Sequence, residues 1–170
     1  FLYGRSKDSL LKAQNRINKT LELLNDLDVV NINQNTGIIN NIELTTNLKE
    51  CISGSDLIIE SINEDLQDKQ ILFKEISDLL KPTSILTSNT SSLMPKLLFS
   101  KIRNKSNVAV THYINPAVLV PLVEIVKHEE TTEDTTSRLA DILMSTGSQP
   151  IILKKETPGF VTSRLQSSLL

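Results

Sequence analysis

Short apolar runs alternate with longer amphipathic stretches along this chain of 170 residues, and this alternation limits its fold more than any other feature. A short apolar run predicts a buried strand, whereas apolar residues three or four positions apart predict a helix. We expect strands at residues 1–3, 42–45, 55–60, 84–87, 108–113, 122–126 and 150–153. We expect helices at residues 7–26, 48–52 and 93–102, from Asn63 to Pro82, from about Thr132 to Gly147, and from Gly159 onward. Strands separated by such helices predict βαβ units, and hence an α/β fold with a doubly wound, mostly parallel sheet.

Residues with capping preferences mark several of these helix ends. Asn63, which acidic residues follow, predicts the N-cap of one helix, and Pro82 predicts its end. Thr131, with an aspartate three positions later, predicts the start of another helix, and Gly147 predicts its end. The Asn-rich stretch at residues 31–41 predicts a loop.

Polar side chains gather where the predicted strands end. The clusters occupy residues 4–6, 61–64, 88–92 and 112–116. Ligands of a doubly wound sheet bind beyond the carboxyl ends of its strands. The sequence therefore predicts a binding site formed by these clusters.

His112 and Glu124 form the most specific pair within these regions. His112 lies between an apolar run and the turn-forming Asn115-Pro116, and Glu124 follows in the next apolar run. An imidazole next to a carboxylate at the mouth of a sheet is the arrangement that orients a general base and tunes it near neutral pH. A half-buried histidine with an unrelated surface glutamate is the alternative, and these residues alone do not decide between the two.

The composition argues against several other classes of protein. A formal net charge of −2, with two Tyr, four Phe and no Trp, offers no surface for nucleic acid. The single Cys51 excludes an internal disulfide and a Cys-rich metal site, so we expect a reducing, cytoplasmic location and no metal centre. No apolar run is long enough to span a bilayer, so no membrane partner is expected. We expect Cys51 to be buried and inert, and His128 to be a solvated surface residue.

Four motifs in register give the chain a resemblance to the 3-hydroxyacyl-CoA dehydrogenase family. They are Ser88-Asn89-Thr90-Ser91-Ser92-Leu93, His112-x-x-Asn115-Pro116, Leu122-Val123-Glu124-Ile125-Val126 and Thr157-Pro158-Gly159-Phe160-Val161. Three further segments are closer to the lambda-crystallin and L-gulonate 3-dehydrogenase branch: Ser91–Pro95, Pro121–Glu124 and Arg164–Gln166. The resemblance implies a Rossmann-type domain of an oxidoreductase that uses NAD to oxidise the 3-hydroxyl of an acyl-CoA or of a small, L-gulonate-like hydroxy acid.

The resemblance also implies roles for individual residues. His112 would be the general base that takes the hydroxyl proton, and Glu124 would hold the imidazole in the right tautomer. Ser91 and Asn115 would hydrogen-bond the substrate oxygen or the nicotinamide. The predicted cofactor-binding residues are Arg5, Ser6, Glu64, Lys69 and Asn89.

Plainer roles stay open for three of these residues. Glu64 is also favoured at a helix N-terminus for electrostatic reasons alone. Lys69 fits a solvated charge on a helix, and Ser91 fits a turn or capping residue.

Several departures from the family pattern bear on activity. No Gly-x-Gly-x-x-Gly occurs in the sequence, so we interpret the chain as a truncated dinucleotide-binding domain whose glycine turn and first strand lie upstream, and which is itself inactive. Gly4 stands where the family has an aspartate for the adenosine ribose, so Arg5 and Ser6 could accept the 2′-phosphate of NADP. Degeneration of this site is the alternative. Ser163 replaces the usual asparagine, and residues 24–30 lack the lysine that reaches CoA in thioester-acting members.

The expected domain organisation follows from the resemblance. Residues 1–156 would form the truncated dinucleotide-binding domain, and residues 157–170 would begin a helical domain that completes the cleft and forms a homodimer. Two other functions stay open: a catalytically inactive, crystallin-like structural protein on the same fold, and a non-enzymatic nucleotide-binding regulator.

Overall fold

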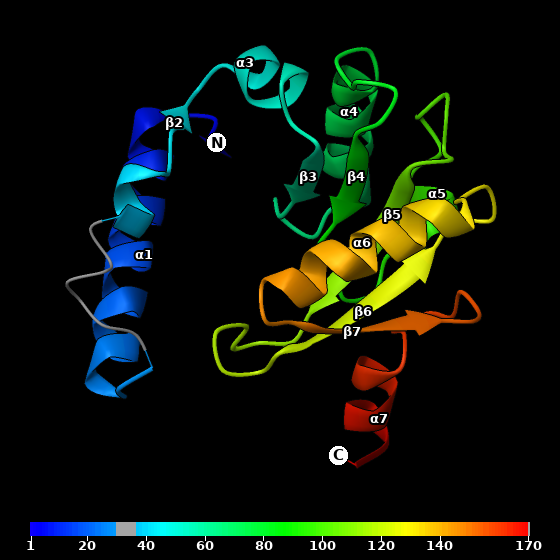
Figure 1. Cartoon of the computed structure of the whole chain (residues 1–170). Helices are drawn as coiled ribbons and strands as arrows, with labels where there is room; N and C mark the ends of the chain where they lie inside the picture. Colours follow the sequence, from blue (N-terminus) through cyan, green and yellow to red (C-terminus); the bar gives the residue numbers. More distant parts are fainter. Residues whose placement is uncertain (30–36, 170) are drawn as a thin grey trace. The chain divides into compact units, whose positions relative to one another are not determined.

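Residues 1–29 and 37–169 are described by the computed structural model of the chain (Figure 1). They belong to two units, Phe1–Gly54 and Ser55–Leu170, each with its own sheet. Most of the predicted Asn-rich loop lies outside the described residues. Its described part is helical at residues 37–40, where the amide of Asn41 donates to the carbonyl of Gly37.

The first unit contains a short parallel strand pair and the longest helix. Strand β1 (Leu2–Tyr3) pairs in parallel with β2 (Leu44–Thr45), and two of the helices in this unit are α1 (Lys7–Asp26) and α3 (Leu48–Ser53). The predicted range of α1 is confirmed. Its N-cap is Ser6, which forms a capping box with Ser9, an arrangement that satisfies two otherwise unpaired amides.

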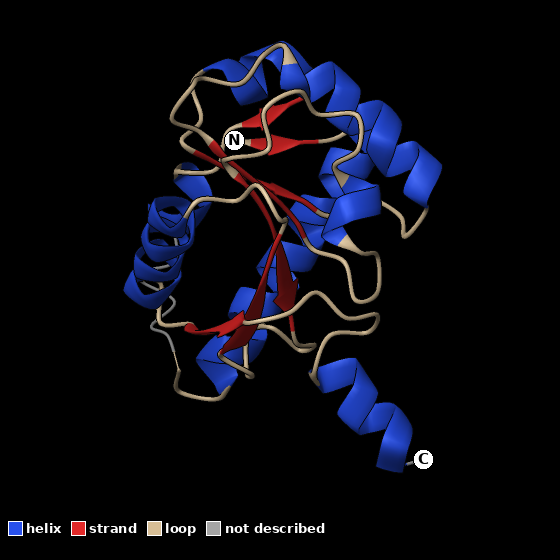
Figure 2. Cartoon of the chain, turned by 90° about the vertical axis from the view of Figure 1, so that its right-hand side faces the viewer, coloured by secondary structure: helices blue, strands red, loops and turns tan. Residues whose placement is uncertain are grey.

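The second unit has a five-stranded sheet of order β3-β4-β5-β6-β7. Figure 2 draws the strands of the chain in red and its helices in blue. Three of the four pairings are parallel, and β5 with β6 is antiparallel, so the prediction of a mostly parallel α/β sheet is confirmed. The strands are β3 (Leu57–Glu60), β4 (Ile85–Ser88), β5 (Val108–Tyr113), β6 (Leu122–Lys127) and β7 (Gln149–Leu153). The helices are α4 (Leu66–Ser77), α5 (Pro95–Leu98), α6 (Glu133–Ser145) and α7 (Thr162–Leu169).

The core of the second unit lies where helices pack on this sheet. Helix α6 buries Leu139 and Leu143 against side chains of β4, β5 and β6, and Figure 1 shows it crossing that face. Phe73 of α4 packs against Phe99, with ring centroids 5.2 Å apart. Gly147 follows α6 with a φ of 84°, a left-handed conformation that glycine adopts without steric cost, so the predicted end of this helix is confirmed.

Several predicted helix boundaries are wrong by one to a few residues. Helix α4 ends at Ser77 rather than at Pro82, and α5 ends at Leu98 rather than at residue 102. Helix α4 is capped by Asp65 rather than Asn63, because the side chain of Asp65 accepts the amide of Asp68. The helix predicted from residue 93 begins only at Pro95, because a proline forces the residue before it into an extended conformation. Helix α6 is capped by Thr132 rather than by Thr131, because the hydroxyl of Thr132 accepts the amide of Thr135.

Two predictions of solvent exposure are also wrong. His128 is 3% exposed, since its Nδ1 accepts the amide of Glu130 and its own amide donates to the hydroxyl of Thr131. Cys51 is half-buried rather than buried, and burial raises the pKa of its thiol. The charged neighbours of His128 predict exposure, because they do not reveal that a turn folds the ring inward.

Among the described residues, no helix combines the length and apolarity that crossing a bilayer requires. In the same ranges, no three His, Cys, Asp or Glu side chains are grouped so that they could hold a metal ion.

Candidate active site

The antiparallel pairing of β5 and β6 brings His112 and Glu124 together. The register places the two residues directly opposite each other, so their side chains project from the same face. The Nδ1 atom of His112 lies 2.7 Å from Oε2 of Glu124. The predicted contact between imidazole and carboxylate is therefore present, and it depends on the strand register.

The Glu124 carboxylate is fully buried, and both of its oxygens are occupied. Its Oε1 accepts the amides of Val161 and Thr162, each at 3.0 Å, while Oε2 faces His112. Burial by itself would raise the pKa of Glu124, but the hydrogen bonds from Thr162, His112 and Val161 outweigh it and lower that pKa. A carboxylate that stays ionised here favours a proton on Nδ1 of the imidazole, which leaves Nε2 as an acceptor.

Phe160 is a site residue that the sequence did not reveal. Its ring packs against the imidazole of His112 with centroids 5.6 Å apart, and the side chain is fully buried. The backbone of Phe160 has a φ of 49°, an uncommon conformation for a bulky residue. This turn points the next two amides at Glu124. The preceding Pro158-Gly159 predicts a turn, but no sequence signal places a left-handed phenylalanine on the histidine.

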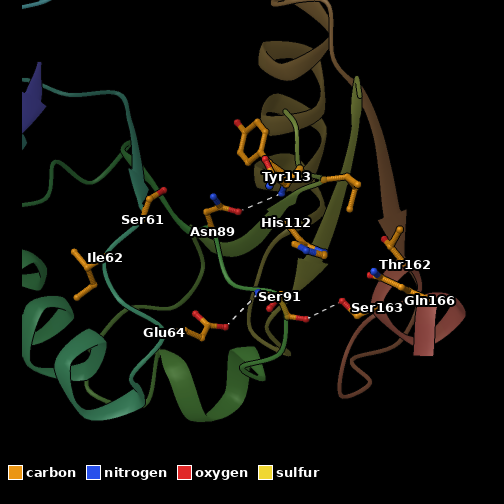
Figure 3. Close-up of a pocket in the computed structure, with 12 residues that line it drawn as sticks. Ser61, Ile62, Glu64, Asn89, Ser91, His112, Tyr113, Thr162, Ser163 and Gln166 are labelled. Carbon is orange, nitrogen blue, oxygen red and sulfur yellow. Dashed lines mark hydrogen bonds between the residues drawn. The ribbon is translucent and has the colours of Figure 1, made fainter. Parts of the chain in front are cut away.

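A pocket of about 700 Å³ opens beside His112 (Figure 3). Segments that follow β3, β4 and β5 line it together with the start of α7. Its lining residues are Ser61, Ile62, Glu64, Asn89, Ser91, His112, Tyr113, Ile114, Asn115, Thr162, Ser163 and Gln166. Asn115 precedes a cis peptide bond to Pro116. Of the predicted residues, the pocket thus gathers His112, Ser91, Asn115, Glu64 and Asn89.

Two polar residues after β4 are held by backbone contacts visible in Figure 3. The side-chain oxygen of Asn89 accepts the amide of Tyr113 at 3.2 Å, which leaves the NH₂ group of Asn89 free to donate. The carbonyl of Ser91 accepts the hydroxyl of Ser163 at 3.4 Å. Ser163, the residue that departs from the family pattern, therefore links α7 to the loop after β4.

Glu64 lies at the pocket, but Lys69 does not line it. Glu64 precedes the N-cap of α4, so its carboxylate turns toward the loop after β4 instead of the helix terminus. It accepts the hydroxyls of Thr90 and Ser92 and the amide of Ser91. Lys69 is fully buried, so the open alternative of a solvated helix charge is excluded.

Arg5 and Ser6 belong to the first unit, whereas the residues that line the pocket belong to the second. Both are exposed, and the Ser6 hydroxyl already caps α1. Gly4 packs closely there: a Cβ at this position would lie 2.6 Å from Oγ of Ser9 and 2.9 Å from the side chain of Leu10. An aspartate at position 4 would therefore force this packing to shift.

Comparison with known proteins identifies relatives across nearly the whole chain. Residues 1–157 match the family model described as 3-hydroxyacyl-CoA dehydrogenase, NAD binding domain. A probable 3-hydroxyacyl-CoA dehydrogenase of Caenorhabditis elegans is 34% identical over 130 residues, 76% of this chain and 42% of that protein. The human lambda-crystallin homolog is 30% identical over 173 residues, 99% of this chain and 53% of that protein.

Solved structures agree with these matches. The crystal structure of 3-hydroxybutyryl-CoA dehydrogenase from Escherichia coli superposes with a TM-score of 0.87 at 29% identity, over 94% of this chain and 34% of that one. The predicted family, its lambda-crystallin branch and the Rossmann-type fold are confirmed. The chain spans about half, or less, of the length of these relatives.

Proposed function

Because this chain belongs to the 3-hydroxyacyl-CoA dehydrogenase family, whose NAD binding domain it matches, we propose that the protein is an NAD-dependent oxidoreductase acting on a 3-hydroxyl group. The observation that carries the proposal is the buried Glu124 held against His112 at the edge of the pocket. The pair has the geometry of a general base with its orienting carboxylate.

The proton chemistry follows from the hydrogen bonds of this pair. Glu124 keeps the proton of the imidazole on Nδ1, so Nε2 accepts the proton of the substrate hydroxyl as the carbon is oxidised. The buried carboxylate then stabilises the imidazolium that forms. Ser91 and Asn115 line the same pocket, where a hydroxyl and an amide can orient the substrate oxygen.

The described side chains fit the nicotinamide end of NAD. The NH₂ group of Asn89 is free to donate, and Glu64 offers a half-exposed carboxylate, so both partners of a carboxamide are present. When bound, the nicotinamide supplies the acceptor for the hydride that leaves the substrate carbon. We further infer that residues 1–170 alone do not retain a dinucleotide, since they contain no Gly-x-Gly-x-x-Gly.

The residues expected at the adenosine ribose determine the choice between NAD and NADP. Gly4 provides no carboxylate for the ribose hydroxyls, while exposed Arg5 and Ser6 could receive a 2′-phosphate. The family supports NAD, and we propose NADP as the alternative cofactor on this basis. Dissociation constants of NADH and NADPH, measured on the full-length natural protein, test it, and tighter binding of NADH would refute it.

We propose only a class of substrate: an acyl-CoA or a small hydroxy acid that carries a 3-hydroxyl group. The test is to assay the full-length protein with 3-hydroxybutyryl-CoA and with L-gulonate, each with NAD and with NADP. A His112→Gln variant provides the matched control for any turnover. If neither substrate reacts with either cofactor, the catalytic proposal has to be withdrawn and a structural protein becomes the better reading.

A further inference from the structure

Among the described residues, Lys69 is the only buried lysine or arginine. Its ammonium donates to both oxygens of Glu60, at 2.7 and 3.0 Å, and to the carbonyl of Ile62 at 3.4 Å. The side chain of Lys69 is 0% exposed.

Glu60 holds this lysine in place. Its side chain is 1% exposed at the end of β3, and it also accepts the hydroxyl of Ser88 and the amide of Ile62. A buried ion pair persists against its desolvation cost only when further hydrogen bonds satisfy the remaining groups. Here they do, so the position of Lys69 is tightly defined.

The lysine connects this buried pair to the pocket through Glu64. Its ammonium lies 3.5 Å from Oε2 of Glu64, whose side chain is 40% exposed. The other oxygen of Glu64 accepts the amide of Ser91 at 3.2 Å (Figure 3). The same oxygen accepts the hydroxyls of Thr90 and Ser92. One carboxylate thus joins the buried lysine to the loop that carries Ser91.

We propose that Lys69, held by Glu60, is a positioning residue that fixes the Glu64 carboxylate and, through it, the Ser91 loop at the edge of the pocket. The identity of the ligand there, a nicotinamide, rests on the proposed function. The positioning itself rests only on the contacts among these residues, and it requires no contact between Lys69 and the ligand.

The first experiment reads the positioning without any ligand. In the full-length protein, the Ser91 amide proton should resonate at low field because it is bonded to a carboxylate. Lys69→Met should move this signal toward the position of an exposed amide. Lys74→Met is the matched control, since Lys74 is exposed on the same helix, and it should leave the signal unchanged.

The second experiment measures the coupling between Lys69 and Glu64 by the affinity of the variants for NADH. Lys69→Met and Glu64→Gln should each weaken binding by about tenfold, and the double variant by about tenfold rather than a hundredfold, as expected for two residues of one network. If Lys69→Met does not fold, the doubly neutral variant Glu60→Gln/Lys69→Met carries the same measurements without a buried unpaired carboxylate.

The outcomes separate the two proposals. Multiplicative losses of NADH affinity, or an unmoved Ser91 signal, overturn the positioning role. A wild-type protein that binds neither NADH nor NADPH, but whose Ser91 signal moves in Lys69→Met, supports the positioning role and counts against the proposed function.

Discussion

Both oxygens of Glu124 have partners, and this determines what a glutamine at that position should do. In Glu124→Gln the amide oxygen can still accept the amides of Val161 and Thr162, which turns the NH₂ group toward His112. An NH₂ group there favours the tautomer with the proton on Nε2, which cannot accept a substrate proton. We expect kcat of the full-length protein to fall by about 10²–10⁴-fold, as measured by steady-state kinetics.

The control for this variant is Glu129→Gln, which removes an exposed carboxylate from the same chain. It should retain the wild-type kcat. An active Glu124→Gln enzyme would show that the carboxylate does not set the tautomer.

The same residue should make stability depend on pH. The pKa of Glu124 is lowered in the folded state, so its ionised form stabilises the fold above its ordinary pKa of about 4.3. That contribution is lost as the pH falls through the lowered, folded value. Urea unfolding between about pH 7 and pH 3 should therefore show the stability advantage of wild type over Glu124→Gln shrinking toward acid. A constant advantage would contradict the lowered pKa.

Gly4 offers a test of steric fit at a single position. An added Cβ would crowd Ser9 and Leu10, so Gly4→Ala should lower the free energy of unfolding by about 1–3 kcal/mol. Gly54→Ala is the matched control, because nothing lies within 4 Å of its Cβ and its φ is −101°. Thermal unfolding should separate the two variants, and equal melting temperatures would argue against the crowding.

At the level of single residues, the sequence predicted the residues proposed to carry the chemistry better than the residues that hold them in place. His112 and Glu124 can be identified from the sequence, because their residue types suit acid–base chemistry and the apolar runs around them predict strands. Phe160 does not, since a left-handed backbone is not visible in a phenylalanine. The partnership of Lys69 with Glu60 was equally hidden, because it joins a strand end to a helix and no local pattern encodes that distance.

At the scale of elements, Thr131 and Thr132 before α6 have different structural roles. Thr132 caps the helix, so Thr132→Ala should cost about 1 kcal/mol. Thr131 instead donates to the carbonyl of Val108 and accepts the amide of His128. Thr131→Ala leaves both groups without this buried partner and should cost about 1–3 kcal/mol. Urea unfolding of the two variants checks the order, and a more damaging Thr132→Ala would contradict it.

Element types were easier to predict than their ends and pairings. The alternation of apolar runs and amphipathic stretches located every strand of the larger sheet, because burial on a sheet imposes that pattern. It could not show that β6 returns antiparallel to β5, since strand direction depends on the connection and not on apolar content. The observed helix starts differ from the predicted ones for another reason. Several consecutive polar residues can each act as an N-cap, and tertiary contacts select one of them.

At the scale of the whole molecule, the buried apolar side chains are unevenly divided. Among the described residues, only Leu10 and Ile52 of the buried hydrophobic set belong to the first unit, and all others belong to the second. Local opening needs less free energy where fewer apolar contacts are lost. In native-state hydrogen exchange of this 170-residue chain, amides of α1 should therefore open at lower free energy than those of β4, β5 and β6. Equal opening free energies would mean that the chain unfolds as one cooperative unit, and the division at Gly54 would then have no energetic counterpart.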